Sequence, residues 1–186
     1  MASGMTALSA SRDRLWRRRP APGAGRQLAW LTDRGSLTDR IRTRCAAFGV
    51  RLLFQGPRRP TRDERLLFGA GKSRALVREV CLDCGGEPVV FAHSVARLRH
   101  LRGPWRALAR LGAQPLGAAL FADPRVKRRP LRFRKLAVSD ELHARACAAL
   151  RARPRVLWAR RSLFTLHNSP ILVTEVFLPG ILKLVP

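Results

Sequence analysis

Arg78 is the first residue whose type and position could do chemistry. It lies in the segment ALVREVCLD (75–83), in which alternate residues fall on opposite faces and both faces are mostly apolar. This pattern is typical of a central strand that is buried on both sides. A buried guanidinium needs an anion, because an unpaired charge in a protein interior costs several kcal/mol. The anion could be a ligand or a carboxylate of the protein, and the side chain could instead extend to the surface.

Glu175 poses the same question with the opposite charge. The segment ILVTEVFLPG (171–180) is apolar almost throughout, and Val173, Glu175 and Phe177 share one face of the expected strand. A carboxylate in such a strand is either paired with a cation or protonated because of desolvation. The chain has 12 acidic residues against 37 basic ones, so an acid within an apolar strand is a candidate site residue. A structural ion pair with one of the many arginines is the alternative.

Other candidate motifs carry weaker signals. CLDC (81–84) matches C-x-x-C, but there is no second pair, the four histidines fit no zinc spacing, and a Gly-Gly turn follows instead of a helix. We interpret Cys81 and Cys84 as incidental thiols and assign the histidines no role. The tetrapeptide GAGK is not a phosphate-binding loop, because its glycine spacing is wrong. The sequence therefore predicts no metal site.

Two predicted hairpins would position Arg78 and Glu175. The first joins 75–83 to 88–95 through the turn CGGE, and the second joins 156–166 to 171–180 through HNSP. Strands that adjoin by tight turns favour a mainly antiparallel sheet over a doubly wound fold. The sequence thus predicts an α+β fold, with the sheet covered by helices in a single domain.

The remaining elements are expected to be short. The patterns predict helices at 28–31 and from Ser36 onward, a strand at 50–55, a loop or flap at 56–64, two helical pieces within 103–121, an edge strand within 130–138 and a helix at 139–152 that begins at Ser139.

Composition limits the classes of partner. The formal net charge of +25 would suit a nucleic-acid-binding protein. Only four basic residues are lysines, however, and the aromatic residues lie mostly in apolar strands instead of among the arginines. The chain overuses residues with G+C-rich codons, so a G+C-rich genome could account for much of the arginine without a nucleic-acid surface, and we expect no specific nucleic-acid partner. No apolar run is long enough to span a membrane.

Residues 1–26 are expected to form a largely disordered basic tail, and residues 27–186 the folded domain. The tail is rich in serine and arginine but lacks the apolar core of an export signal. We therefore expect a cytoplasmic protein with reduced cysteines. The tail could make a weak electrostatic contact with an anionic membrane.

Five segments in order resemble the chorismate–pyruvate lyase (chorismate lyase) family of bacterial ubiquinone biosynthesis. They are WLTDRGSLTDRIR (30–42), LVREVCLDCGGEPVVFAHSV (76–95), GPWRALARLGAQPLGAALF (103–121), LWARRSLF (157–164) and ILVTEVFLP (171–179). The combination of RE-x-x-L-x-x-x-GEP, L-G-x-x-P-LG, W-x-RRS and TE-x-FLP is specific, although no single segment is.

The resemblance implies a six-stranded antiparallel sheet with a ligand pocket buried beneath helical flaps. It implies a monomeric enzyme that converts chorismate to 4-hydroxybenzoate and pyruvate without a cofactor, the first step of ubiquinone biosynthesis. On the matching motifs, Arg78 would bind the ring carboxylate as a bidentate ion pair, and Glu175 would lie near the 4-hydroxyl. Leu37 and Leu116 would contact the ligand through backbone or apolar side chain. Whether Glu175 acts as acid, base or hydrogen-bonding group is left open.

A non-catalytic effector-binding domain is the alternative from a different class. Domains of the same fold type bind small molecules in some transcription regulators, where they follow a DNA-binding domain of about 70 residues. The segment before residue 27 is too short for such a domain, so the sequence favours the enzyme.

Overall fold

A computed structural model describes residues 15–68, 73–150 and 153–184. A seven-stranded antiparallel sheet runs through it in the order β1-β2-β3-β7-β6-β4, and β5 also pairs with β6. The strands are β1 Phe48–Arg58, β2 Ala75–Cys84, β3 Glu87–Arg97, β4 Lys127–Arg128, β5 Arg132–Ala137, β6 Val156–Leu166 and β7 Ser169–Phe177. This confirms the predicted α+β fold with a mainly antiparallel sheet.

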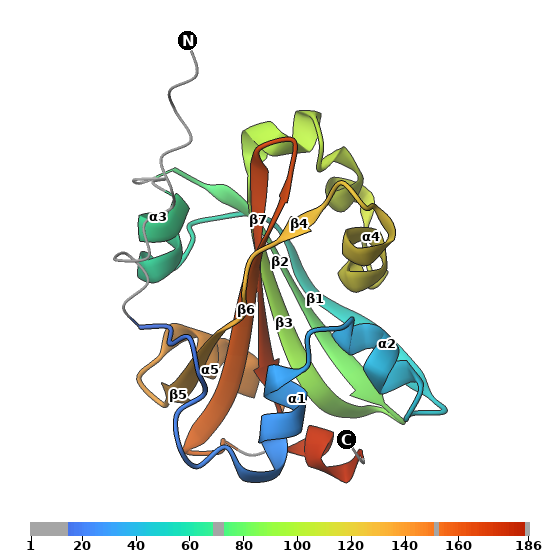
Figure 1. Ribbon diagram of the computed structural model, residues 1–186, viewed down its shortest axis with the longest axis vertical. Helices are drawn as coiled ribbons and strands as arrows, with labels where there is room; N and C mark the ends of the chain where they lie inside the picture. Colours follow the sequence, from blue (N-terminus) through green and yellow to red (C-terminus); the bar gives the residue numbers. More distant parts are fainter. Residues whose placement is uncertain (1–14, 69–72, 151–152, 185–186) are drawn as a thin grey trace.

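Short helices cover both faces of the sheet. Helices α2 and α4 lie on one side, and α3 and α5 lie on the other (Figure 1). The α-helices are α1 Leu28–Thr32, α2 Leu37–Arg42, α3 Arg62–Phe68, α4 Leu116–Ala122 and α5 Glu141–Cys147. Single-turn 3-10 segments are η2 Gly25–Gln27, η3 Leu98–Arg102, η4 Arg106–Arg110 and η5 Pro179–Lys183. Among the described residues, none of these helices has the length and apolarity needed to cross a bilayer.

The two predicted hairpins form and pair with each other through β3 and β7. Strand β2 is buried along almost its whole length, as its apolar pattern predicted. In the register of the sheet, Arg78 stands opposite Ser94, and Ala92 stands opposite both Val80 and Glu175. Alternation along the strands therefore places Arg78 and Glu175 on the same face.

Each face of the sheet carries its own packed core. On one face, α1 and α2 pack on β2, β3 and β7, with residues such as Trp30, Leu37 and Val80 in one cluster, and α4 packs beside Leu76 and Phe164 in a second. On the other, α5 packs around Cys81 and Leu157, and α3 packs on the far ends of the same strands. The sheet thus separates two layers of helices, and only the first layer covers the face of Arg78 and Glu175.

Two local predictions are wrong. The stretch 56–64 is not one loop, because β1 continues to Arg58 and α3 begins at Arg62. The predicted helix 139–152 is shorter, since α5 begins after Asp140 instead of Ser139 and ends at Cys147. Asp140 is held by Arg134 and by the amide of Ala137, so its carboxylate fixes the turn that precedes the helix.

The folded part begins earlier than the expected boundary at residue 27. Trp16 is 2% exposed and donates from Nε1 to Oδ2 of Asp63 at 2.9 Å. Arg17 exchanges two backbone hydrogen bonds with Phe133 of β5. The described part of the expected tail is therefore attached to the domain at Trp16 and Arg17, whereas residues 1–14 lie outside the described residues.

The prediction that all four cysteines are reduced is wrong for two of them. Cys45 and Cys84 form a disulfide with their Cα atoms 5.8 Å apart, while Cys81 and Cys147 are free and buried. The C-x-x-C pair does not act as a unit, because Cys81 and Cys84 stand on opposite faces of β2. The bridge connects the end of β2 to the segment that follows α2.

Candidate active site

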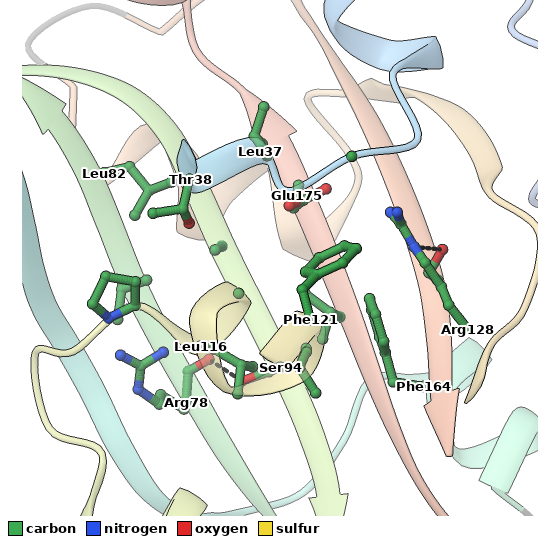
Figure 2. A pocket seen from close by; sticks show the side chains of 18 residues that line it. Leu37, Thr38, Arg78, Leu82, Ser94, Leu116, Phe121, Arg128, Phe164 and Glu175 are labelled. Carbon is green, nitrogen blue, oxygen red and sulfur yellow. Dashed lines mark hydrogen bonds between the residues drawn. The ribbon is translucent and has the colours of Figure 1, made fainter. Parts of the chain in front are cut away.

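A pocket lies between the sheet and the helices that cover the face of Arg78 and Glu175. Its floor comes from β2, β3, β7 and β6, and its cover comes from α2, α4 and the residues before α4 (Figure 2). The lining is mostly apolar. The described lining residues are Gly35, Leu37, Thr38, Arg78, Val80, Leu82, Ala92, Ser94, Pro115, Leu116, Gly117, Leu120, Phe121, Arg128, Ser162, Phe164, Val173 and Glu175. All four predicted site residues are therefore brought together at one cavity.

Arg78 is a buried cation without a carboxylate partner among the described residues. Its side chain is 2% exposed, and its Nη2 donates to the backbone oxygens of Gly112 at 2.8 Å and Gln114 at 2.6 Å. Its Nε also donates to the Gly112 oxygen. Burial lowers the pKa of Arg78 to about 10. The carbonyls orient the guanidinium but leave its charge uncompensated, as expected of a site for an anion.

Glu175 lies on the pocket floor and forms an ion pair. Its Oε2 accepts a hydrogen bond from Nε of Arg160 at 2.5 Å. Arg160 is fully buried, and its Nη1 also donates to the backbone oxygens of Trp30 and Asp33. Arg160 therefore connects the carboxylate to the end of α1. The sequence left two alternatives for Glu175, a site residue or a structural ion pair. In the structure Glu175 lines the pocket and also pairs with an arginine.

The two charged residues lie far enough apart to hold a small ring between them. Arg78 and Glu175 are two strands apart and offset by two residues, which separates their Cα atoms by about 12 Å. The floor between them is formed by the small apolar side chains of Val80, Ala92 and Val173. Figure 2 shows Arg78 and Glu175 at different ends of the cavity. The arrangement suits a flat molecule with an anionic group at one end and a hydrogen-bonding group at the other.

Leu37 and Leu116 form part of the cover. Each is the first residue of its helix, α2 and α4, so its amide N–H has no acceptor within the helix. Ser36 caps α2 by accepting from the amide of Asp39, as the S-x-x-D pattern predicted. A Cβ on Gly117 would approach Oγ1 of Thr38 to 3.3 Å, so the two covering helices meet at this glycine.

Sequence reasoning missed two arginines of this region. Arg160 belongs to the W-x-RRS motif, but nothing in the motif showed that it would reach both Glu175 and α1. Arg128 lines the pocket and donates from Nε to Oγ of Ser162 at 3.1 Å. In a chain with so many arginines, no local pattern distinguishes Arg128 from its neighbours.

The opposite face of the sheet carries a buried network of charges that does not reach the pocket. His93, which the sequence left without a role, lies with Nδ1 3.0 Å from Oε1 of Glu79 and with Nε2 3.0 Å from Oε1 of Glu64. Arg145 also pairs with Glu79 at 2.7 Å. Burial alone would lower the pKa of His93, but the two carboxylates outweigh it and raise that pKa to about 9.

No metal centre was found in the part of the chain that the structure describes, where no group of three or more His, Cys, Asp or Glu side chains could hold an ion. The polar side chains that line the pocket are two arginines, one glutamate and the hydroxyl groups of serine and threonine. These can bind an anion, exclude water and exchange or orient a proton.

Comparisons of the sequence with known proteins agree on one family. A family model described as Chorismate lyase matches residues 15–185. The "Probable chorismate pyruvate-lyase" of Nitrosospira multiformis is 52% identical over 171 residues, which cover 91% of this chain and 95% of the relative. The protein of the same name from Nitrosomonas europaea is 54% identical over 156 residues, covering 83% and 88%.

Two solved structures share the fold at low sequence identity. The PhnF C-terminal domain aligns with a TM-score of 0.54 at 12% identity, covering 70% of this chain and 82% of that one. The effector domain of PhnF from Mycobacterium smegmatis aligns with a TM-score of 0.53 at 14% identity, covering 78% and 90%. At this level of identity the likeness extends to the fold alone.

Proposed function

The chain belongs to the chorismate lyase family, and on that premise we propose that it converts chorismate into 4-hydroxybenzoate and pyruvate in the pocket beneath α2 and α4. The observation that carries the proposal is Arg78, a buried cation held by backbone oxygens at one end of an apolar cavity whose other end holds Glu175. The ring carboxylate would pair with Arg78, and the 4-hydroxyl would lie at Glu175.

The proposed reaction is an elimination that needs only positioning and proton transfer. Chorismate carries its 4-hydroxyl on one ring carbon and the enolpyruvyl ether on the next. Loss of the proton on C4 and cleavage of the C3–O bond create the third ring double bond. The enolpyruvate that leaves takes up a proton and becomes pyruvate. The reaction is balanced without an oxidant, a reductant or added water. The gain in aromaticity of the ring favours the products.

Glu175 is the group placed to assist this step. Arg160 holds Oε2, and Oε1 has no hydrogen-bond partner among the described residues. Oε1 can therefore hydrogen-bond the 4-hydroxyl or exchange a proton at the reacting end of the ring. Leu37 and Leu116 would close the pocket over the ring and keep water out, which strengthens the pairing at Arg78.

Membership of the family also supports proposals for the location, oligomeric state and pathway of the protein. We expect a cytoplasmic monomer at the first step of ubiquinone biosynthesis, without a specific nucleic-acid partner and with at most a weak electrostatic contact with anionic membranes. The fold alone is also compatible with the alternative, a non-catalytic effector-binding domain, because one of the solved structures named above is described as an effector domain.

Turnover separates the two functions. The purified protein is incubated with chorismate, without added metal or nucleotide, and 4-hydroxybenzoate and pyruvate are quantified. We expect the two products in equal amounts. Binding of 4-hydroxybenzoate without any turnover of chorismate would favour the effector-binding alternative.

Glu175→Gln tests the proton-handling role. We expect the dissociation constant of 4-hydroxybenzoate to change by less than about threefold and kcat to fall by about a hundredfold or more, the usual contribution of a positioned acid or base. Glu87→Gln is the matched control, since Glu87 is a half-buried glutamate of β3 that pairs with Lys183 away from the pocket lining. Unchanged turnover in Glu175→Gln would remove Glu175 from the mechanism.

A further inference from the structure

A cleft lined by arginines adjoins the pocket. It has a volume of about 500 Å³ and lies where the N-terminal segment, the α1–α2 connection and the segment before β5 meet. Five arginines line it, and the described residues of the lining include no acid: Arg18, Arg19, Arg34, Arg128 and Arg129. Such a concentration of one sign of charge in a concave surface raises the local concentration of anions.

Arg128 lines both the cleft and the pocket. Figure 2 shows it across the cavity from Arg78, beyond Phe121 and on the side of Glu175. An anion bound at Arg128 would therefore lie at the end of the pocket where the bond to the leaving group is expected to break.

The guanidinium of Arg128 is fixed in place but keeps a free donor. Its Nε donates to Oγ of Ser162, and its Nη1 donates to the backbone oxygen of Arg34. It also lies over the rings of Phe121 and Phe164, 5.3 and 5.2 Å from their centroids. Its Nη2 has no acceptor among the described residues. The side chain is thus preorganised to offer Nη2 to a ligand.

The acids nearest to Arg128 are already paired. Glu175 accepts from Arg160 at 2.5 Å, and Asp33 accepts from Arg40 at 2.7 Å. No salt bridge within 4.0 Å joins Arg128 itself to a carboxylate of the described residues. Its charge is therefore available to an anion that enters from the cleft.

We propose that Arg128 binds the second carboxylate of the substrate, the one on the enolpyruvyl group, and that the arginine-lined cleft is the path along which the departing pyruvate leaves. The inference rests on the proposed function, because it assigns the second charge of the same substrate. Chorismate is a dianion, and Arg78 accounts for only one of its carboxylates. After cleavage the two charges belong to different products: 4-hydroxybenzoate stays at Arg78 and pyruvate at Arg128.

A ligand pair that differs by one carboxylate tests this assignment directly. The monoanion is 4-hydroxybenzoate, and the dianion is 3-(carboxymethoxy)-4-hydroxybenzoate, which carries a second carboxylate where the enolpyruvyl group is attached. In Arg128→Gln we expect the dianion to bind about ten- to hundredfold more weakly, the range for a lost charge-assisted hydrogen bond. Binding of 4-hydroxybenzoate should change by less than twofold.

Kinetics give a second readout. The KM for chorismate should rise in Arg128→Gln by a similar factor, and Arg128→Lys should restore part of the loss because it keeps the charge. Arg125→Gln is the matched control, since Arg125 is exposed and pairs with Asp123 outside the pocket lining. We expect its kinetics to equal those of the wild type.

The outcomes distinguish this inference from a structural role and from the proposed function. If Arg128→Gln weakens both ligands equally and lowers the melting temperature, Arg128 only supports Phe121 and Phe164, and the inference is wrong. Equal affinity of wild type and variant for the dianion would also overturn it. If the wild type makes no 4-hydroxybenzoate, the proposed function fails, whereas the comparison of the two ligands still reports on Arg128.

Discussion

Replacing Arg78 by methionine should remove ligand binding while leaving the free protein nearly as stable as the wild type. Methionine has a similar length and no charge, so it fills the space and removes the buried cation. The usual loss on breaking a buried ion pair does not apply, because no carboxylate of the described residues pairs with Arg78. The prediction therefore separates a binding residue from a residue that holds the fold together.

The expected change in the free energy of unfolding follows from the burial and the hydrogen bonds of Arg78. The lowering of the pKa of Arg78 to about 10 by burial corresponds to a cost of roughly 3 kcal/mol for the charged form. Its bonds to the oxygens of Gly112 and Gln114 offset that cost. In the variant these oxygens can turn to water, because Gln114 is exposed and Gly112 only half-buried. We expect the free energy of unfolding to change by less than about 2 kcal/mol.

Thermal unfolding with and without 4-hydroxybenzoate measures both the stability of the free protein and its ligand binding. At a ligand concentration of about 100 times Kd, the wild type should gain about 2.7 kcal/mol, or roughly 5–10 °C in melting temperature. Arg78→Met should show no such gain, whereas the control Arg51→Met, on the exposed edge strand β1, should keep it. A ligand-induced shift that survives in Arg78→Met, or a loss of more than about 4 kcal/mol in the free protein, would refute the reasoning.

Two further predictions concern buried ion pairs. Arg160→Met leaves Glu175 unpaired and frees carbonyls of α1, so chemical denaturation should show a loss of about 3–5 kcal/mol; a loss under 1 kcal/mol would contradict this. The carboxylates of Glu64 and Glu79 raise the pKa of His93, against its burial, to about 9. That stabilisation is complete below the unfolded pKa of about 6.5 and is lost as pH rises towards 9. The unfolding free energy should fall by roughly 3 kcal/mol over this interval in the wild type but not in His93→Gln, and equal slopes would contradict the assignment.

The alternation of residues along a strand was enough to identify Arg78 and Glu175 as charges within apolar strands, but not to predict that they share a face. Arg78 and Glu175 stand out because a charge in an apolar strand needs an explanation, and the sheet register then brings both to one cavity. Leu37 and Leu116 came only from the resemblance to a family, since a leucine at a helix start carries no local signal of ligand contact. Their roles stay predictions.

What the sequence could not predict depends on contacts between distant segments. Arg160 reaches the oxygen of Asp33 across 127 positions, and Cys45 bridges to Cys84 rather than taking part in a local motif. Helix α3 was missed because its acids resembled a solvated loop, although Glu64 is fully buried beside His93. In each case the residue bonds to a partner from another element, which the sequence around it does not indicate.

The few acidic residues of the chain are distributed unequally between the two faces of the sheet. On the face away from the pocket, carboxylates surround the buried cations: Glu64 and Glu79 flank His93, and Glu79 also accepts from Arg145. On the pocket face, Glu175 is taken by Arg160, and Arg78 faces the cavity without a described carboxylate partner. A genome rich in G+C can supply arginines everywhere, but it does not explain this division. Arg78 is therefore available to a small anion in the free protein, and the excess of bases over acids leaves few carboxylates that could neutralise it. Adding one acid there, as in Val80→Glu beside Arg78, would supply the missing countercharge and compete with the substrate.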